Sequence, residues 1–204
     1  MRHVLALLRP RFLVPVLAAN TLPLALLAQA TDVMFIDGGF TEICTSAAFR
    51  ADDPSAVQLT GSRLAMDPVE ICTMAIGSPE ATPLQRAASY NNRGVLYFTD
   101  GKIEESLHDF DAAVALDPAL GTAYVNRGYV LMALKRFEDS IAAFDQGLAR
   151  GVTDPERAYF NRGIAHEESG HVREAYYDYR KASELKPDWE EPLRELTRFS
   201  VRTR

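Results

Sequence analysis

The sequence contains few of the residues and motifs on which enzymes and metalloproteins usually depend. Its 204 residues include only two cysteines, four histidines and one tryptophan. Neither the G-x-S-x-G motif of serine hydrolases nor the phosphate-binding P-loop occurs. The C-x-x-C spacing of thiol redox sites is also missing. We therefore expect no catalytic residue, no metal and no cofactor.

Acidic residues are missing from the first thirty positions and are in excess over the rest of the chain. The charged side chains before Thr31 are Arg2, Arg9 and Arg11. The whole chain has a formal net charge of −6, so the part after Ala30 is still more acidic. A nucleic-acid binder needs a basic face against the phosphate backbone, and adhesion to anionic lipid needs basic residues too. The charge therefore disfavours both kinds of partner.

Residues 1–30 have the three-part pattern of a secretory signal peptide. A short basic stretch precedes the apolar run Phe12–Leu27, and Ala28-Gln29-Ala30 then supplies an A-x-A cleavage site. The alternative is a retained membrane anchor. However, two prolines and an asparagine interrupt the apolar run, whereas a spanning helix needs about 20 mostly apolar residues. We expect cleavage near Ala30/Thr31, no membrane segment after cleavage, and a periplasmic location.

Residues 31–82 are predicted to form an N-terminal arm and a helical cap. The apolar run Val33–Ile36 suits a short strand or an extended arm. One short helix is expected over residues 40–49. A second is expected to open at Asp67-Pro68, with the aspartate as N-cap and the proline at the first helical position.

The two cysteines are predicted to form a disulfide. Cys44 and Cys72 each lie on the apolar stripe of one of these two helices. In an exported chain, an even count of two favours a bridge over two buried free thiols. Such a bridge would stabilise the cap by about 3–4 kcal/mol, because it restricts the unfolded chain.

A five-residue pattern, Tyr-x-Asn-Arg-Gly, occurs three times in the second half of the chain. It begins at Tyr90, Tyr124 and Tyr159, so its glycines lie 34 and 35 residues apart. If each glycine is the eighth position of its unit, large residues recur at positions four and twenty-four. Small residues recur at positions eight, twenty and twenty-seven. This pattern indicates units of two antiparallel helices that meet at the small residues.

The pattern resembles the tetratricopeptide repeat family over about residues 87–188, and we place the three repeats at 83–187. The resemblance implies an all-α solenoid of three helix pairs with a helical cap at each end. The C-terminal cap should occupy residues 188–204 as a helix that reaches Phe199 or Val201. Its apolar residues are expected to pack on the last repeat, and they are Trp189, Leu193 and Leu196.

The second unit departs from the pattern in two places. Lys135 stands in the turn between its helices, where the other units have glycine. One extra residue occurs near Gly151, which predicts a longer connector to the third unit.

The first helix of each tetratricopeptide repeat lines a concave groove, and the resemblance implies such a groove here. Asn92, Asn126 and Asn161 recur once per unit, and each amide can both donate and accept a hydrogen bond. They could therefore bind the backbone of a peptide or partner helix. The residues assigned to the groove by resemblance are Asn91, Asn92, Val95, Phe98, Val125, Asn126, Tyr129, Met132, Arg157, Phe160, Asn161 and Ile164.

Two other interpretations of the groove stay open. The asparagines could bond within the array, between neighbouring first helices. Alternatively, the N-terminal arm or the C-terminal tail of the chain could fill the groove. In some relatives a clamp of basic residues grips a peptide carboxylate, but only Asn126 and Arg157 fit that clamp. Asn91 and Val95 replace its lysine and asparagine, so the clamp is not carried over.

The predicted function is a protein–protein interaction scaffold or adaptor in the bacterial cell envelope, with a peptide or protein as partner. One alternative is a self-assembling structural module, and another is a hydrolase that uses His166 or His171. These histidines resemble a zinc-protease motif, but they are five residues apart and Gly170 should end the helix. The repeated arginines are expected to pair with acids on neighbouring helices, and they are Arg93, Arg127 and Arg162.

Overall fold

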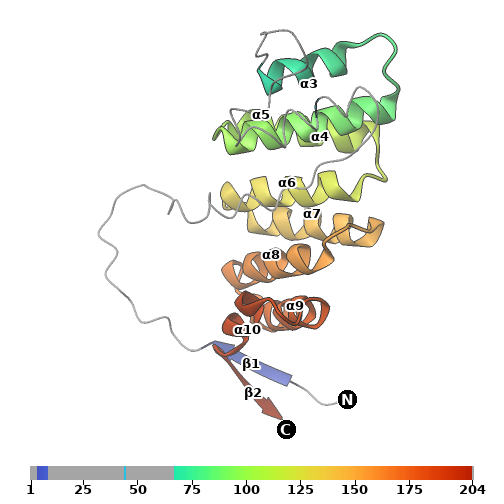
Figure 1. Cartoon of the computed structure of the whole chain (residues 1–204). Coiled ribbons are helices and arrows are strands. Elements are labelled where there is room, and N and C mark those ends of the chain that lie inside the picture. The colour runs from blue at the N-terminus through green and yellow to red at the C-terminus, as the bar shows by residue number, and fades with distance from the viewer. Residues whose placement is uncertain (1–3, 9–43, 45–66, 204) are drawn as a thin grey trace, which may run out of the picture.

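The computed structural model describes residues 4–8, 44 and 67–203. Within these ranges, three antiparallel helix pairs stack one after another, with α3 at one end and α10 at the other (Figure 1). The pairs are α4 (Pro83–Thr99) with α5 (Ile103–Leu116), α6 (Gly121–Ala133) with α7 (Phe137–Arg150), and α8 (Pro155–Glu168) with α9 (Val172–Leu185). The predicted all-α solenoid of three helix-pair repeats is confirmed.

Helix α3 (Pro68–Gly77) packs against α4 and begins as predicted. Asp67 is its N-cap, and the carboxylate accepts a hydrogen bond of 3.0 Å from the backbone N–H of Val69. Thr82 and Gln85 form a capping box in front of α4, so Pro83 occupies the first turn, where proline is tolerated. Local capping chemistry thus determines where both helices begin.

The repeated glycines allow the two helices of each unit to approach closely. A Cβ atom on Gly94 would lie 2.9 Å from the ring of Phe110, which is 1% exposed. Gly128 and Gly163 face Phe144 and Tyr179 in the same way, at 3.0 Å and 2.9 Å. The small residue at position eight and the ring at position twenty-four are therefore one packing unit, repeated three times.

One of the two departures of the second unit has the expected position. Lys135 adopts a positive φ of 58° in the turn where Gly101 and Gly170 have φ of 74° and 81°. This backbone conformation strains a residue that has a Cβ atom. Gly151, with φ of 83°, ends α7, and the chain resumes a helix only at Pro155. Four residues, 151–154, thus join α7 to α8, and four residues, 117–120, join α5 to α6, so the expected longer connector is wrong. The extra residue lies instead at the start of α8, which begins eight residues before Gly163, whereas α6 begins seven before Gly128.

The C-terminal segment differs from the prediction. Helix α10 (Glu190–Leu196) ends before Phe199, and strand β2 (Phe199–Thr203) follows it. Strand β2 pairs antiparallel with β1 (Val4–Leu8), so the expected helix to Phe199 or Val201 is wrong. Three residues of β2 are of the aromatic and β-branched types that favour strands, and they outweigh the helical periodicity of the preceding residues.

Contacts of α10 also correct one residue of the predicted cap. Trp189 and Leu196 pack on the third helix pair as expected. Leu193, however, is 47% exposed, and Pro192 is the buried residue of this short helix. Trp189 and Pro192 therefore lie on the side that faces the helix pairs, and Leu193 points to solvent.

Several predictions fall outside the described residues. The arm Val33–Ile36 and the helix over 40–49 lie there, apart from Cys44. Strand β1 lies inside the stretch predicted to be a signal peptide, so its pairing with β2 concerns the uncleaved chain. Among the described residues, no helix combines the length and apolar character needed to cross a membrane.

Candidate functional site

The predicted groove residues lie on α4, α6 and α8, and we call their surface the first-helix face. Helix α4 contacts α6, and α6 contacts α8, so the face is continuous along the array. Ten of its twelve residues are buried, and Arg157 and Ile164 are partly exposed. The structure thus brings the predicted residues together on one side of the first helices.

A chain of side-chain amides crosses this face between the first and second units. Asn126 Nδ2 donates to Asn91 Oδ1 at 2.9 Å, and Asn91 Nδ2 donates to Asn92 Oδ1 at 3.2 Å. All three side chains are at most 1% exposed. The amides thus join α4 to α6, in agreement with the hypothesis that they bond within the array.

The third asparagine has different partners. Asn161 Nδ2 donates to the backbone oxygen of Arg157 at 2.9 Å and lies 3.4 Å from the hydroxyl of Tyr129. Burial raises the pKa of Tyr129 well above its ordinary value, so this hydroxyl stays protonated. The contact joins α8 to α6. Ligand binding by the same face is not tested by these bonds and stays a prediction.

The apolar residues of the first-helix face also belong to the core. Val95 and Phe98 pack with Phe110, whereas Val125, Tyr129 and Met132 pack with Phe144. The rings of Tyr129 and Phe144 meet edge to face, with centroids 5.4 Å apart. A change at these positions would therefore alter folding as well as any ligand contact.

At the third unit, the C-terminal segment of the chain lies against the first-helix face. The ring of Trp189 lies 4.8 Å from that of Phe160. Glu167 accepts hydrogen bonds from the Arg198 guanidinium and from the Tyr179 hydroxyl, the latter at 3.1 Å. Burial lowers the pKa of Arg198, but Glu167 and Glu195 outweigh it and raise that pKa overall. The segment after α9 thus covers part of the third unit.

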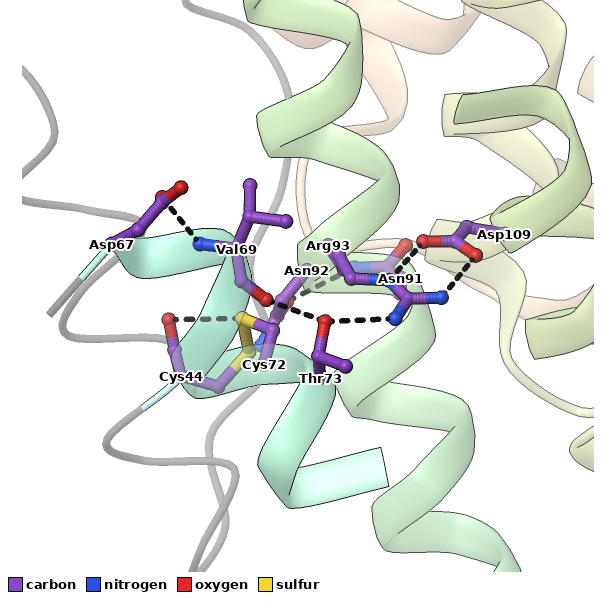
Figure 2. Close-up of a disulfide and its surroundings, with 9 residues drawn as sticks. All are labelled: Cys44, Asp67, Val69, Cys72, Thr73, Asn91, Asn92, Arg93 and Asp109. Carbon is purple, nitrogen blue, oxygen red and sulfur yellow. Dashed lines mark hydrogen bonds and ion pairs between the residues drawn. A yellow bond between two sulfur atoms is a disulfide. The ribbon is translucent and has the colours of Figure 1, made fainter. Parts of the chain in front are cut away.

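The arginine of the Tyr-x-Asn-Arg-Gly pattern pairs with carboxylates in all three units, as predicted. Figure 2 shows the pair in the first unit. Arg93 donates to both carboxylate oxygens of Asp109, at 2.7 and 2.9 Å, and to Thr73 Oγ1 of α3 at 3.0 Å. Asp109 is 1% exposed. Its hydrogen bond raises the pKa of Arg93. One guanidinium therefore joins α3, α4 and α5.

The other two arginines of the pattern differ in whether their carboxylate partner is buried or exposed. Arg162 repeats the bidentate contact with Asp178, at 2.8 and 2.6 Å, and reaches Asp145 of the preceding unit at 2.5 Å. Arg127 binds only the exposed Asp111, at 2.6 Å, and Ala143 stands where the buried aspartate would be. The buried aspartates were missed in the sequence. Their spacing of sixteen residues from the arginine could have identified them.

The predicted disulfide is present between Cys44 and Cys72. Both cysteines are fully buried and share a cluster with Leu96 of α4. Together with the contact between Arg93 and Thr73, the bridge fixes residue 44 beside the first unit (Figure 2). No free cysteine occurs among the described residues.

His166 and His171 lie beside one another at the turn between α8 and α9. Their Nδ1 atoms are 3.4 Å apart, and the second nitrogen of each faces a carboxylate, Asp178 at 3.9 Å and Glu138 at 3.8 Å. Gly170 ends the first helix, as expected. Within 4–8, 44 and 67–203, no cluster of three or more His, Cys, Asp or Glu side chains could hold a metal.

Comparison with known proteins identifies the repeats. Two family models, both described as tetratricopeptide repeat, match residues 91–155 and 156–189. The chain belongs to the tetratricopeptide repeat family. The matches cover the first repeat from residue 91 onward and all of the other two.

Several proteins of known sequence are similar to this one. Mouse RNA polymerase II-associated protein 3 is 30% identical over 117 residues, which are 57% of this chain and 17% of that protein. The DnaJ homolog subfamily C member 7 homolog of Dictyostelium discoideum is 28% identical over 92 residues, covering 45% and 16%. The chain thus spans about a sixth of the length of these two relatives. Protein MJ0572 of Methanocaldococcus jannaschii is 32% identical over 66 residues, covering 32% and 77%.

Solved structures share the arrangement of helices. The first repeat domain of Spaghetti, bound to the HSP90 peptide SRMEEVD, is 27% identical with a TM-score of 0.54. The match covers 57% of this chain and 91% of that domain. A MamA double mutant has a TM-score of 0.60 at 16% identity, covering 78% and 82%, and supports the fold alone.

Proposed function

We propose that this protein is a peptide-binding adaptor whose first-helix face holds an extended segment of a partner protein. The observation that carries the proposal is the similarity to the first repeat domain of Spaghetti, which is bound to an HSP90 peptide. The match extends over 91% of that domain. The helix pairs that form the peptide-bound domain therefore have counterparts here.

The chemistry of the first-helix face suits a peptide backbone with apolar side chains. Amide groups of Asn92, Asn126 and Asn161 recur at the spacing of the units, and each can donate and accept. Between them stand aliphatic, aromatic and thioether side chains, which favour burial of apolar groups. Arg157 is the one cation among the twelve residues of the face, so a single acidic residue of the peptide would be favoured near α8.

A free peptide carboxylate is not the group that this face favours. Asn91 occupies a position where the clamp has lysine, and its side chain bonds to Asn126 and Asn92. Val95 occupies another and is 2% exposed. Because the first of these clamp positions has lost a positive charge and the second an amide, we expect SRMEEVD to bind at least about tenfold more weakly than an internal apolar segment.

We place the adaptor in the bacterial cell envelope. The signal-like residues 1–30 and the buried disulfide support this location, since disulfides persist mainly in oxidising compartments. Expression of the full chain in a Gram-negative host tests it. N-terminal sequencing of the periplasmic protein should begin at Thr31, whereas an intact N-terminus in the cytoplasmic fraction would refute it.

Peptide selection followed by charge reversal tests the function. Peptides are selected from a random display library on the full chain, and their affinity is measured by fluorescence anisotropy. Arg157→Glu should weaken binding by about tenfold or more, because it reverses the one basic group of the face. The matched control Arg180→Glu changes an exposed arginine of α9 and should alter affinity less than about twofold. Equal loss in both variants, or no selected peptide, would refute the proposal.

A further inference from the structure

We propose that His166 and His171 form a zinc site at the turn between α8 and α9. Each imidazole binds the ion through Nδ1, and water completes the tetrahedral coordination. This site goes beyond the peptide-binding function and does not depend on it, because neither histidine is among the twelve residues of the first-helix face. It also revises the expectation, drawn from the sequence, that the protein binds no metal.

The backbone of the turn brings the two histidines together. The N–H of His171 donates to the carbonyl of His166 at 2.8 Å, and the N–H of Gly170 donates to the carbonyl of Glu167 at 3.0 Å. With the positive φ of Gly170, these bonds form a Schellman motif. The residues at the two ends of the longer loop of this motif are frequently in apolar contact. Here both positions carry an imidazole, the commonest metal-binding side chain.

The other two units have the same turn without imidazoles. The N–H of Lys102 donates to the carbonyl of Tyr97 in the first unit, and the N–H of Arg136 donates to that of Leu131 in the second, both at 2.8 Å. The Lys102 ammonium lies 5.5 Å from the centre of the Tyr97 ring, and Leu131 is buried. The turn thus forms with other residue pairs, so its folding does not explain the two histidines of the third unit.

The distance between the two imidazoles fits a tetrahedral zinc ion. The Nδ1 atoms of His166 and His171 lie 3.4 Å apart, which is beyond the usual range for a hydrogen bond. Zinc binds imidazole nitrogen at about 2.0–2.1 Å, and two such bonds at the tetrahedral angle separate the nitrogens by about 3.3–3.4 Å. Neighbouring nitrogens in a square plane, as copper prefers, would be only about 2.8–3.0 Å apart. The separation therefore favours zinc.

Carboxylates stand behind both rings. His166 Nε2 faces Asp178 at 3.9 Å, and His171 Nε2 faces Glu138 at 3.8 Å. A carboxylate beside Nε2 favours the tautomer that has its proton there, which leaves a lone pair on Nδ1. Two such lone pairs face each other across the turn and repel, unless a cation lies between them. The same arrangement, with a carboxylate behind the second nitrogen, is usual for histidines that bind zinc.

Access and charge also suit a divalent cation. The His171 side chain is 45% exposed and that of His166 is 14% exposed, so an ion can reach the pair from solvent. The charge of the nearby Arg162 is offset by its bonds to Asp178 and Asp145. Over the part of the chain that the structure describes, no group of three or more ligands could hold a metal. Water therefore takes the other positions, and the site is weaker than a structural site with four protein ligands.

A bound ion should stabilise the third unit. It would join the last turn of α8 to the first residue before α9, on either side of Gly170. The unfolded chain does not hold the two imidazoles at this separation, so zinc binds the folded state preferentially. Zinc should therefore raise the melting temperature of the protein, and the rise should grow with zinc concentration.

Titration calorimetry with zinc chloride tests the site on the full chain without an affinity tag. The variants are His166→Leu and His171→Arg, which introduce the residue types that the second unit has in the same turn. The control His108→Gln changes an exposed histidine of α5. We expect one zinc ion per chain in the wild type and the control, and at least about tenfold weaker binding in each variant.

Three results would overturn the proposal. The first is a wild type that binds no zinc below about 1 mM, which would leave the two rings as a contact within the turn. The second is equal affinity for the wild type and both variants, which would place the ion elsewhere. The third is a loss in His108→Gln as large as that in His166→Leu.

A second measurement needs only the wild type. Nitrogen-15 signals of the imidazoles are recorded while zinc chloride is added. We expect the Nδ1 signals of His166 and His171 to shift, while their Nε2 atoms keep their protons and the signals of His108 stay in place. Shifts at His108 alone, or binding through Nε2, would refute the site. Because no peptide is involved, a failed peptide selection leaves this result unchanged, and the two proposals are tested separately.

Discussion

The side-chain amide of Asn126 donates a hydrogen bond of 2.9 Å to the side-chain oxygen of Asn91, which lies on the first helix of the preceding unit. Both residues are buried. The bond joins α4 to α6 at the surface that we propose as the peptide-binding face. Stability and binding are therefore coupled at this pair.

Removal of this amide should destabilise the array. Asn126→Ala removes a buried hydrogen bond between the side chains of two neighbouring units, which we expect to cost about 1–3 kcal/mol of unfolding free energy. Urea denaturation measures the loss. The control Gln146→Ala removes an exposed amide of α7 and should change stability by less than about 0.5 kcal/mol. Equal effects in the two variants would contradict a role for the Asn126–Asn91 bond in joining the units.

The repeated arginines offer a matched pair of substitutions. Arg93→Gln leaves the buried carboxylate of Asp109 without its bidentate partner and should cost about 3–5 kcal/mol. Arg127→Gln removes an ion pair with Asp111, whose side chain is 52% exposed, and should cost at most about 1 kcal/mol. Both values come from urea denaturation. If the two losses are equal, the Arg93 pair contributes no more than a surface ion pair.

The glycine of the Tyr-x-Asn-Arg-Gly pattern should not tolerate a larger residue. Gly94→Ala places a Cβ atom against the buried ring of Phe110, and we expect a net loss of about 1–2 kcal/mol despite the better helix propensity of alanine. Gly77→Ala is the control, because its added Cβ meets nothing within 4 Å apart from its chain neighbours and the backbone of its own helix. A rise in melting temperature for Gly94→Ala would show that the helix pair can relax around the ring.

The disulfide can be tested by thiol titration of the wild type and by the stability of a variant without the cysteines. Protein unfolded in guanidinium without reductant should show no free thiol in an Ellman titration, because Cys44 and Cys72 are joined. Two thiols should appear after reduction. The double alanine variant should lose about 3–4 kcal/mol of stability. Detection of two thiols before reduction would remove both the bridge and the support that it gives to export.

Stability should depend on pH through His166. Burial lowers the pKa of His166, and Arg162 and His171 lower it further, against Asp178 and Glu174, which raise it. Because the folded state binds the proton more weakly than the unfolded state, this contribution is fully present above the ordinary pKa of 6.5 and is lost as the pH falls below it.

A variant without the His166 imidazole isolates that contribution. The fall in melting temperature between about pH 7.5 and about pH 5.5 should be smaller in His166→Gln than in the wild type. Other titrating groups are the same in both proteins, so the difference reports His166. An equal fall in both proteins would contradict a lowered pKa in the folded state.

Much of the fold could be predicted because repetition reinforces local signals. One glycine opposite one aromatic ring would be weak evidence, but three such pairs at the same spacing specify three helix pairs. Caps at Asp67 and Thr82 are local, so the starts of α3 and α4 could be predicted as well.

The predictions that failed depend on contacts between distant segments. Strand β2 pairs with residues at the other end of the chain, and no periodicity near Phe199 indicates that pairing. Leu193 and Pro192 are neighbours in sequence, and only the packing of α10 decides which one is buried. The partners of the asparagines depend in the same way on how closely α4 and α6 approach.

The most direct test of the peptide-binding face is a titration that detects its side-chain amides. NMR signals of the asparagine side-chain NH₂ groups are recorded while a library-selected peptide is added to the full chain. We predict that the largest shifts occur at Asn91, Asn92 and Asn126, together with the backbone signals of α4, α6 and α8. Shifts confined to α5, α7 and α9 would contradict binding at the first-helix face.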